Sequence, residues 1–347
     1  MVLSYISMKK SKTKGKTSKR AFITGISGQD GYYLSKLLVS KGYVVCGLVR
    51  DKRAAEKVFN GCDPKIKSHI EIIVGDLSDR SLVREILNEF NPGEIYNLAA
   101  ISDLATSFKN PEKTMEVNCE APGKMIADAF KILPNVKMFM ASSAQIFDSS
   151  HPPQSERTAF KPENPYAVSK LKLHQKYVLP FRKKGLYVCS GFSFNHESPR
   201  RKDLVVYKVT SSLVKIKVDK LDCLELGNLE TIRDWGYAGD YVEAMWKMLQ
   251  SRKADDFVIA TGKAHTVREL VELTAISLGT VVKWQGQGVN EVGVDKSGRT
   301  IVKINPNFYR NESGYYVGDI SKIKRKLGWQ PRASFRKLVR LMLESRR

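Results

Sequence analysis

A short apolar run followed by three regularly spaced glycines constrains the fold of this chain more than any other feature. Residues 21–24 are apolar or β-branched, Gly25, Gly28 and Gly31 follow, and leucines then recur at helical spacing. This order predicts a strand, a tight turn and a helix, and a second strand is expected at 43–49. Because glycines let backbone N–H groups approach a pyrophosphate, the unit is typical of a dinucleotide-binding site.

Strand-like and helix-like segments continue to alternate along the chain. Apolar runs predict strands at 70–74, 94–100 and 136–140, and helical periodicity covers 79–90 and 111–130. Nearly continuous apolar strands separated by helices indicate a parallel sheet that is covered on both faces. The expected fold class is therefore α/β, a Rossmann-type doubly wound parallel sheet with a smaller C-terminal α/β lobe.

The same reading gives domain boundaries. We expect a disordered basic arm at 1–18, a dinucleotide-binding Rossmann domain formed by 19–192 plus 229–262, and a substrate-binding lobe formed by 193–228 plus 263–347. Ligands of such sheets bind beyond the carboxyl ends of the strands.

The residue that ends the second expected strand bears on the choice of dinucleotide. A carboxylate at this place accepts the ribose hydroxyls of NAD, whereas this chain has Arg50, with Lys52 and Arg53 just after it. Cations there fit a 2′-phosphate, so NADP is the expected cofactor. Asp51 favours NAD instead, and a solvated basic loop is the structural alternative.

Three side chains suggest proton transfer. Ser143 follows an expected strand and so reaches the ligand edge of the sheet, while Tyr166 and Lys170 lie one turn apart on a helix that starts at Pro165. A cation beside a phenol favours the phenolate, which moves a group that titrates near pH ~10 toward neutrality. The spacing alone also fits a surface helix, so the argument depends on its combination with the serine and the glycine turn.

Charge and composition restrict the partners. The net charge is +22, but the seven basic groups and no acids of residues 1–20 leave +15 for the remainder, spread over polar helix faces. A phosphate-bearing substrate also favours a basic surface, so no nucleic-acid partner is expected. The five cysteines are scattered and no metal site is expected. Without a long apolar run or a signal segment, a cytoplasmic protein with no membrane partner is expected.

Several longer segments carry a family resemblance. They are 23–31, 97–100, 164–170, 194–201, 226–229, 233–236 and 260–269. In these segments the chain resembles the extended short-chain dehydrogenase/reductase superfamily and, within it, the GDP-mannose 4,6-dehydratase family. The resemblance implies NADP, a GDP-sugar substrate, an enzyme that is a nucleotide-sugar dehydratase, and a homodimer or homotetramer.

The resemblance also implies residue roles. The catalytic residues would be Ser143, Tyr166 and Lys170. The cofactor would be bound by Gly25, Gly28, Gln29, Asp30, Gly31, Arg50, Asp76, Leu77, Leu98, Ala99, Tyr166, Lys170, His196 and Arg201. The GDP-sugar would be bound by Asn195, Lys208, Arg233, Arg310 and Glu312.

The sequence departs from the family pattern at Gln145. The family oxidises carbon 4 of the sugar, eliminates water across carbons 5 and 6, and returns the hydride to carbon 6; its glutamate removes the proton from carbon 5. This chain has Gln145 where the resemblance expects that glutamate. A carboxamide is too weakly basic to serve as a general base, and Asp148 lies beyond the strand end.

Three functions therefore stay open from the sequence. The first is the family reaction, which converts GDP-mannose to GDP-4-keto-6-deoxymannose. The second is a GDP-sugar oxidoreductase or epimerase that acts at carbon 4, since that chemistry needs no base at carbon 5. The third is a catalytically impaired binding or regulatory paralogue, which the intact Ser143, Tyr166 and Lys170 disfavour.

Overall fold

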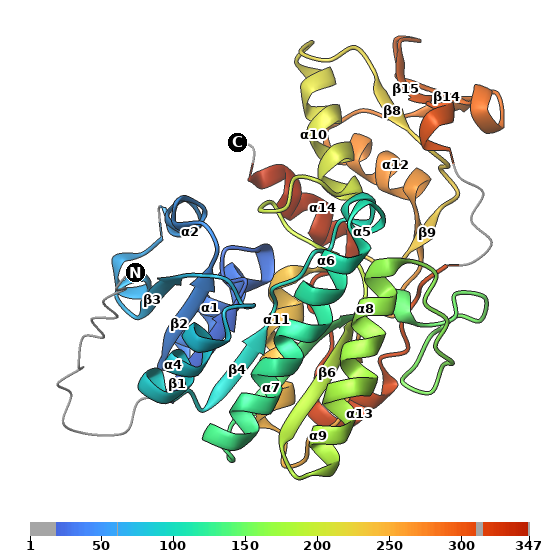
Figure 1. Ribbon diagram of the computed structural model, residues 1–347. Helices are drawn as coiled ribbons and strands as arrows, with labels where there is room; N and C mark the ends of the chain where they lie inside the picture. The colour runs from blue at the N-terminus through green and yellow to red at the C-terminus, as the bar shows by residue number, and fades with distance from the viewer. Residues whose placement is uncertain (1–18, 61, 310–314, 346–347) are drawn as a thin grey trace. The chain divides into compact units, whose positions relative to one another are not determined.

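The computed structural model describes residues 19–60, 62–309 and 315–345, and Figure 1 labels most of its helices and many of its strands. The first part of the chain comprises β1 (Lys19–Thr24), α1 (Gln29–Ser40), β2 (Tyr43–Val49), α2 (Lys52–Phe59), α3 (Pro64–Lys67), β3 (Ile70–Val74), α4 (Arg80–Phe90), β4 (Glu94–Asn97), α5 (Leu104–Lys109), α6 (Pro111–Met115), η1 (Glu116–Glu120), α7 (Ala121–Ile132) and β5 (Lys137–Ser143). The predicted arm at 1–18 lies outside the described residues.

The second part continues with alternating helices and short strands. It comprises η2 (Ala144–Ile146), α8 (Pro165–Leu173), η3 (His174–Val178), α9 (Leu179–Lys183), β6 (Tyr187–Ser193), β7 (His196–Glu197), α10 (Val205–Lys217), β8 (Leu224–Leu226), β9 (Ile232–Arg233), β10 (Gly236–Tyr237), α11 (Ala238–Gln250), β11 (Phe257–Ile259), β12 (His265–Thr266), α12 (Val267–Ser277), β13 (Lys283–Gln285), η4 (Gly288–Asn290), β14 (Val292–Val294), β15 (Thr300–Ile304), η5 (Pro306–Phe308), α13 (Ser321–Leu327) and α14 (Phe335–Glu344).

Seven strands form one sheet in the order β11-β6-β5-β4-β1-β2-β3. The pairs β1–β2, β2–β3, β1–β4, β4–β5 and β6–β11 are all parallel. The strand order reverses beside β1, where β2 lies on one side and β4 on the other, and ligands of doubly wound folds bind at such a point. The predicted fold class, a Rossmann-type parallel sheet with flanking helices, is confirmed.

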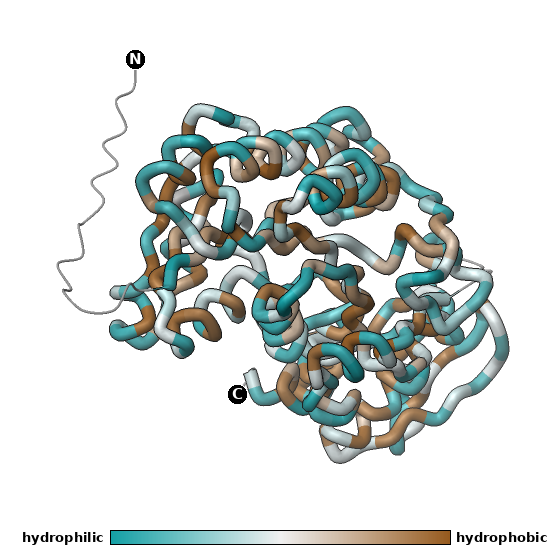
Figure 2. The backbone as a smooth tube through the Cα atoms, turned by 90° about the horizontal axis from the view of Figure 1, so that it is seen from below, coloured by the Kyte–Doolittle hydropathy of each residue, from teal (hydrophilic) through white to brown (hydrophobic). Residues whose placement is uncertain are grey.

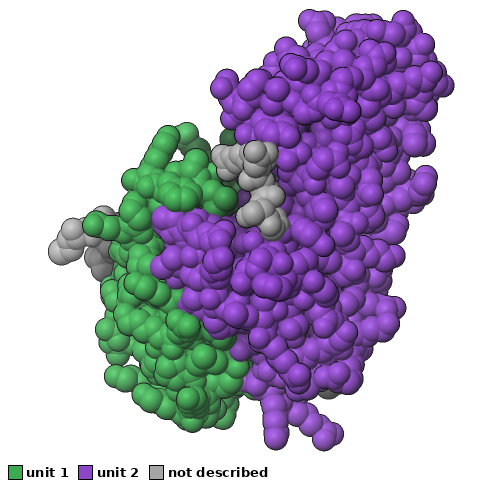
Figure 3. Space-filling view, turned by 90° about the vertical axis from the view of Figure 1, so that its right-hand side faces the viewer, with its two compact units in different colours: residues 1–140, 172–189 green, residues 141–171, 190–347 purple. Residues whose placement is uncertain are grey.

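The chain divides into two compact units, which Figure 3 colours separately. Unit 1 contains residues 1–140 and 172–189, and unit 2 contains 141–171 and 190–347. The alternation of hydrophobic and hydrophilic residues along the helices is visible in Figure 2. The two units are defined by packing, whereas the functional division into a cofactor domain and a substrate lobe stays a prediction.

Unit 1 has a core in which strand and helix side chains interdigitate. Phe22 of β1, Ile95 of β4 and Ile126 of α7 are all fully buried there. Two π-helical turns, η1 and η3, interrupt segments that the sequence predicts as continuous helices. In each case a proline follows closely, Pro122 after η1 and Pro180 after η3. A proline lacks the N–H that an α-helix needs, and a wider turn accommodates its ring.

Unit 2 contains a separate four-stranded sheet in the order β13-β14-β15-β8. Its core includes Leu213 of α10, Leu270 of α12 and Met342 of α14. The C-terminal helix α14 packs on this core, and its apolar stripe is buried against α10 and α12. No helix within the described ranges is both long and apolar enough to cross a membrane.

Candidate active site

The glycine turn of unit 1 leaves no room for side chains. Gly25 has a φ of +71°, and a Cβ built on it would lie 2.7 Å from the backbone nitrogen of Ala99. A Cβ on Gly31 would lie 2.5 Å from the backbone of Ile26. Gly28 is the N-cap of α1 and brings no side-chain cap to its first turn. A backbone cradle at an uncapped helix N-terminus fits the pyrophosphate of a dinucleotide.

Strands β1 and β4 are tied together at the edge where this turn begins. Thr24 Oγ1 donates to Asn97 Oδ1 at 2.7 Å, and the backbone N–H of Ala99 donates to Thr24 Oγ1 at 3.2 Å. The segment that contains Leu98 and Ala99 is thereby held beside the glycine turn. Sequence reasoning named Leu98 and Ala99 but missed Thr24 and Asn97, whose partners lie far along the chain.

Other residues predicted to bind the cofactor lie on three segments of unit 1. Gln29 and Asp30 occupy the first turn of α1, and Leu77 is buried after β3. Arg50 is exposed where β2 ends.

The side chains of the two acids near Arg50, Asp51 and Asp76, each accept hydrogen bonds from their own turn. Asp51 caps α2, its side chain accepting from Arg53 N at 2.9 Å. Burial raises the pKa of Asp76, but hydrogen bonds from Ser78 and the cations Lys113 and Arg50 outweigh it and hold that pKa below its ordinary value. A carboxylate that caps a helix is a poorer ribose ligand, so Asp51 weighs less against NADP than the sequence alone suggests.

In unit 2, Tyr166 and Lys170 occupy the first two turns of α8. Lys170 is 3 % exposed and its Nζ donates to the carbonyl oxygen of Ala141 at 2.8 Å. The same Nζ lies 5.9 Å from the centre of the Tyr166 ring. Burial lowers the pKa of Lys170 to about 8. The ammonium is therefore anchored to the end of β5 on the tyrosine side of the helix.

Ser143, Gln145 and Asn164 form a connected polar group next to this helix. Ser143 is the last residue of β5, which runs three residues past its predicted end, and its Oγ accepts from the backbone N–H of Gln145 at 3.2 Å. Asn164 Nδ2 donates to Gln145 Oε1 at 2.9 Å, while Asn164 Oδ1 accepts from Ala167 N at 2.8 Å. Asn164 thus caps α8 and holds Gln145 at once, a role the sequence did not indicate.

The segment between η2 and α8 is anchored by aromatic packing. Phe147 is fully buried, bridges to Phe160 and packs edge-on against Phe192 at 5.1 Å between ring centres. Asp148 follows it, and its carboxylate accepts from the N–H and the Oγ of Ser150. Those bonds lower the pKa of Asp148 and bind its carboxylate to its own loop.

The residues predicted to contact sugar and nicotinamide lie on β7 and the segments around it. The ring of His196 stacks on Tyr241 at 4.4 Å, and its Nδ1 is 2.8 Å from Phe194 O. Arg201 pairs with Asp203. Asn195 precedes β7, and its carbonyl oxygen accepts from Gly236 N.

The residues predicted to contact the GDP part lie further along unit 2. Lys208 Nζ lies 4.6 Å from the centre of the Phe308 ring, and burial lowers the pKa of this lysine. Arg233 ends β9 and its guanidinium donates to the carbonyl oxygen of Ile232. Arg310 and Glu312 lie outside the described residues.

A buried aspartate organises the loops next to Arg233. Asp234 is fully buried, and its carboxylate accepts from Thr261 N, Thr261 Oγ1 and Gly262 N. These hydrogen bonds lower the pKa of Asp234, but burial outweighs them and raises it above its ordinary value. The sequence placed Asp234 in a family segment without a role, and the structure gives it one, that of closing the loop after β11.

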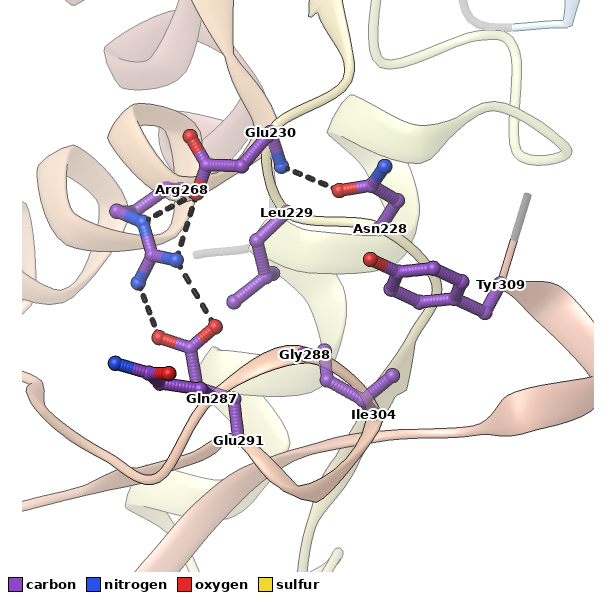
Figure 4. Close-up of a pocket in the computed structure, with 9 residues that line it drawn as sticks. All are labelled: Asn228, Leu229, Glu230, Arg268, Gln287, Gly288, Glu291, Ile304 and Tyr309. Atoms are coloured by element: carbon purple, nitrogen blue, oxygen red, sulfur yellow. Dashed lines mark hydrogen bonds and ion pairs between the residues drawn. The ribbon is translucent and has the colours of Figure 1, made fainter. Parts of the chain in front are cut away.

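A cavity of about 230 Å³ lies elsewhere in unit 2, as Figure 4 shows. Within it the Arg268 guanidinium is bridged by the carboxylates of Glu230 and Glu291, at 2.7 and 2.8 Å. Because both carboxylates already neutralise this arginine, it is not an open phosphate site. Within the described ranges, no group of three or more His, Cys, Asp or Glu side chains is arranged to hold a metal ion.

Solved structures of other proteins share this fold. A UDP-N-acetylglucosamine 4-epimerase from Methanobrevibacter ruminantium M1, in complex with UDP-N-acetylmuramic acid, aligns with a TM-score of 0.77 and 21% identity over 95% of this chain and 98% of its own. RMD from Pseudomonas aeruginosa, complexed with NADPH, aligns with a TM-score of 0.74 and 19% identity over 94% and 98%. At these identities the likeness shows the fold alone.

Sequence comparisons give the family. The family model described as GDP-mannose 4,6 dehydratase matches residues 22–342. The GDP-mannose 4,6 dehydratase of Cricetulus griseus is 41% identical over 96% of this chain and 92% of its own length, and that of Homo sapiens is 40% identical over 95% and 92%. The resemblance that the motifs carry is confirmed, and the chain belongs to the GDP-mannose 4,6-dehydratase family.

Proposed function

We propose that the protein is an NADP-dependent GDP-sugar enzyme of the GDP-mannose 4,6-dehydratase type, which begins its reaction by oxidising carbon 4 of the hexose. The observation that carries this proposal is the anchored Lys170 ammonium beside Tyr166, in a chain of this family. A binding protein gains nothing from burying a lysine in this way, since burial of an ammonium costs free energy.

The residues around Tyr166 have different roles in proton transfer. Lys170 stabilises the phenolate, which takes the proton of the carbon 4 hydroxyl. Ser143 Oγ already accepts from Gln145 N, so its own proton is available to donate to the same sugar oxygen. When bound, NADP would supply the acceptor for the hydride that leaves carbon 4. Water is excluded from the lysine because only 3 % of Lys170 is exposed.

The residues of unit 1 fit NADP on two grounds. Gly25, Gly28 and Gly31 leave a backbone cradle for the pyrophosphate, and Arg50 offers a guanidinium for the 2′-phosphate while Asp51 caps its helix. Among the sequence-predicted contacts, we assign His196 and Arg201 to the cofactor, and Asn195, Lys208, Arg233, Arg310 and Glu312 to the GDP-sugar.

A second candidate function has one observation in its favour. Gln145 is an amide, and completed dehydration needs a base that removes the proton from carbon 5. A GDP-sugar oxidoreductase or epimerase that works only at carbon 4 needs none. A binding or regulatory paralogue is the third candidate. We also propose that the protein is cytoplasmic and that it forms a homodimer or homotetramer, and light scattering tests the oligomeric state.

The test is an incubation of protein, NADP and GDP-mannose in deuterated water, followed by mass spectrometry. Product that has lost one water and gained solvent deuterium supports the dehydratase. Reduction of a 4-keto-6-deoxy GDP-sugar by NADPH supports the oxidoreductase, and tight binding without turnover supports the paralogue. Tyr166→Phe is the matched control, because it keeps the ring and removes the phenol. Equal turnover by this variant contradicts the proposal.

A further inference from the structure

The hydrogen bonds of Asn164 determine which way the Gln145 amide faces. The backbone N–H of Ala167 can only donate, so the Asn164 atom that it meets at 2.8 Å is Oδ1. The other end of Asn164 is then Nδ2, which can only donate, so the Gln145 atom at 2.9 Å is Oε1. Gln145 therefore has Nε2 as its remaining side-chain atom.

The backbone of Gln145 is fixed as firmly as its side chain. Its N–H donates to Ser143 Oγ, and its neighbours Ala144 and Ile146 are buried, at 4 % and 0 % exposure. Among the described residues, Nε2 has no acceptor, although the side chain is partly exposed. Ser143 and Gln145 thus present two donors, a hydroxyl proton and an amide, from adjacent positions at the end of β5.

Neither Asp148 nor Glu197, the two other carboxylates considered for this role, supplies a base in its place. Asp148 is bound by the N–H and the hydroxyl of Ser150. Glu197 is 1 % exposed, and burial raises its pKa to about 8, so it is protonated at neutral pH. A protonated carboxyl holds the proton that a base must take.

We propose that Gln145 determines the outcome of the reaction: its Nε2 donates a hydrogen bond to an oxygen of the hexose, removes no proton from carbon 5, and leaves the hydroxyl on carbon 6. This inference rests on the proposed function, because it concerns the sugar that Tyr166 and NADP oxidise. The substrate class is a GDP-hexose that keeps its 6-hydroxyl.

The chemistry balances without loss of water. Tyr166 takes the proton of the carbon 4 hydroxyl while the hydride passes to NADP, which gives a 4-keto sugar and NADPH. Return of the same hydride to carbon 4 and of the proton to its oxygen restores a GDP-hexose. Delivery to the opposite face of the carbonyl gives the carbon 4 epimer.

The amide position also accepts a carboxylate without disturbing its neighbours. In Gln145→Glu one carboxylate oxygen replaces Oε1 and accepts from Asn164 Nδ2, while the other replaces Nε2 as an acceptor. A positioned general base contributes roughly 10²–10⁴-fold in rate. The variant is therefore expected to gain elimination at carbons 5 and 6 that the wild-type protein lacks.

A second variant tests the orientation itself. In Asn164→Asp the carboxylate still accepts from Ala167 N but has no proton for Oε1, so the Gln145 amide turns and presents Oε1 to the sugar. Loss of one donated hydrogen bond is expected to raise the KM for GDP-mannose roughly ten-fold. Ser150→Ala, in the neighbouring loop, is the control that leaves this amide in place.

The experiment compares wild-type protein, Gln145→Glu and Asn164→Asp with NADP and GDP-mannose in deuterated water. Because the hydride returns to the sugar, NADPH is followed in a single turnover with protein in excess, where its transient absorbance reports oxidation at carbon 4. Mass spectrometry reports lost water and gained deuterium. The expected result is NADPH without dehydration for the wild type and dehydrated, labelled product for Gln145→Glu. Dehydration by the wild type at the rate of Gln145→Glu overturns this inference alone. No NADPH from any of the three proteins overturns the proposed function as well.

Discussion

A buried carboxyl, Glu197, gives the sharpest prediction about stability. Glu197 is 1 % exposed, and its carboxyl oxygens face the backbone N–H groups of Val206 and Tyr207 at the start of α10. Burial raises its pKa to about 8, and the backbone N–H groups of Val206 and Tyr207 and the charge of Arg201 oppose that rise only in part. The folded chain therefore retains a proton here that an unfolded chain releases.

The sign and size of the effect follow from this pKa. The ordinary pKa is 4.5. Between that value and 8 the folded state binds more protons than the unfolded state, so the free energy of unfolding falls as the pH rises. The slope is about 1.4 kcal/mol per pH unit, which gives a cost of about 3 kcal/mol at pH 7. A glutamine in this place matches the protonated carboxyl in shape and cannot ionise when the chain unfolds.

The assay is urea unfolding of wild-type protein and Glu197→Gln at pH 5 and pH 7. The variant is expected to be about equal in stability at pH 5 and more stable than wild type by about 3 kcal/mol near pH 7. Glu89→Gln, on the exposed face of α4, is the control for the loss of a surface carboxylate. A stability difference between Glu197→Gln and wild type that is the same at both pH values refutes the reasoning.

Three further changes test other parts of the structure. Lys170→Met removes the ammonium beside Tyr166 and should lower the rate of NADPH formation by roughly 10² or more, with unchanged circular dichroism; an active variant contradicts the assigned role. Gly25→Ala places a Cβ against Ala99 at a φ of +71°, so it should cost roughly 1–2 kcal/mol of stability and weaken the binding of NADP, which calorimetry measures. Gly42→Ala is the control, because Gly42 has a φ of +81° but open space around it, and this variant should bind NADP as the wild type does. Gln154→Leu removes buried bonds to Val317 N and Tyr315 O and should lower the free energy of unfolding by roughly 1–3 kcal/mol; thermal melting that is unchanged contradicts this.

The sequence predicted the central strands well because their limits are chemically sharp. The strands at 43–49 and 70–74 match β2 and β3 residue for residue, since each is a β-branched or apolar run bounded by turn residues. The end of β5 was placed too early, at residue 140. Ala141, Ser142 and Ser143 continue the strand, because small residues fit a buried sheet edge although their composition resembles a loop.

No sequence pattern indicates the polar group around Gln145. Asn164 belongs to the family segment at 164–170, but its partner is 19 residues away across an irregular loop. The contact depends on how Phe147 and Phe160 fold that loop back, which no periodicity reports. Lys170 illustrates the opposite case, because its position on α8 followed from helical spacing while its burial required the structure.

The pKa of Lys170 predicts the pH above which the reaction rate should fall. Its pKa of about 8, lowered by burial, means that the ammonium is charged below pH 8 and neutral above it. A neutral amine no longer favours the phenolate of Tyr166, so the rate of NADPH formation should fall about ten-fold per pH unit beyond that point. Lys170 and Glu197 have opposite effects on the pH dependence of stability. Between pH 8 and 10.5 the unfolded chain binds more protons at Lys170 than the folded chain does, so the contribution of Lys170 to the free energy of unfolding rises with pH.

The two groups titrate in the same range, so one variant must separate them. Glu197→Gln removes the carboxyl and leaves the lysine. If Lys170 sets the alkaline limb of the rate profile, the limb stays at about pH 8 in that variant. A limb that disappears with Glu197→Gln instead assigns the loss to ionisation of the carboxyl, whose charge would then be attracted to the first turn of α10 and to His196. A rate that keeps rising to pH 10 in both proteins contradicts a charged lysine at Tyr166 altogether.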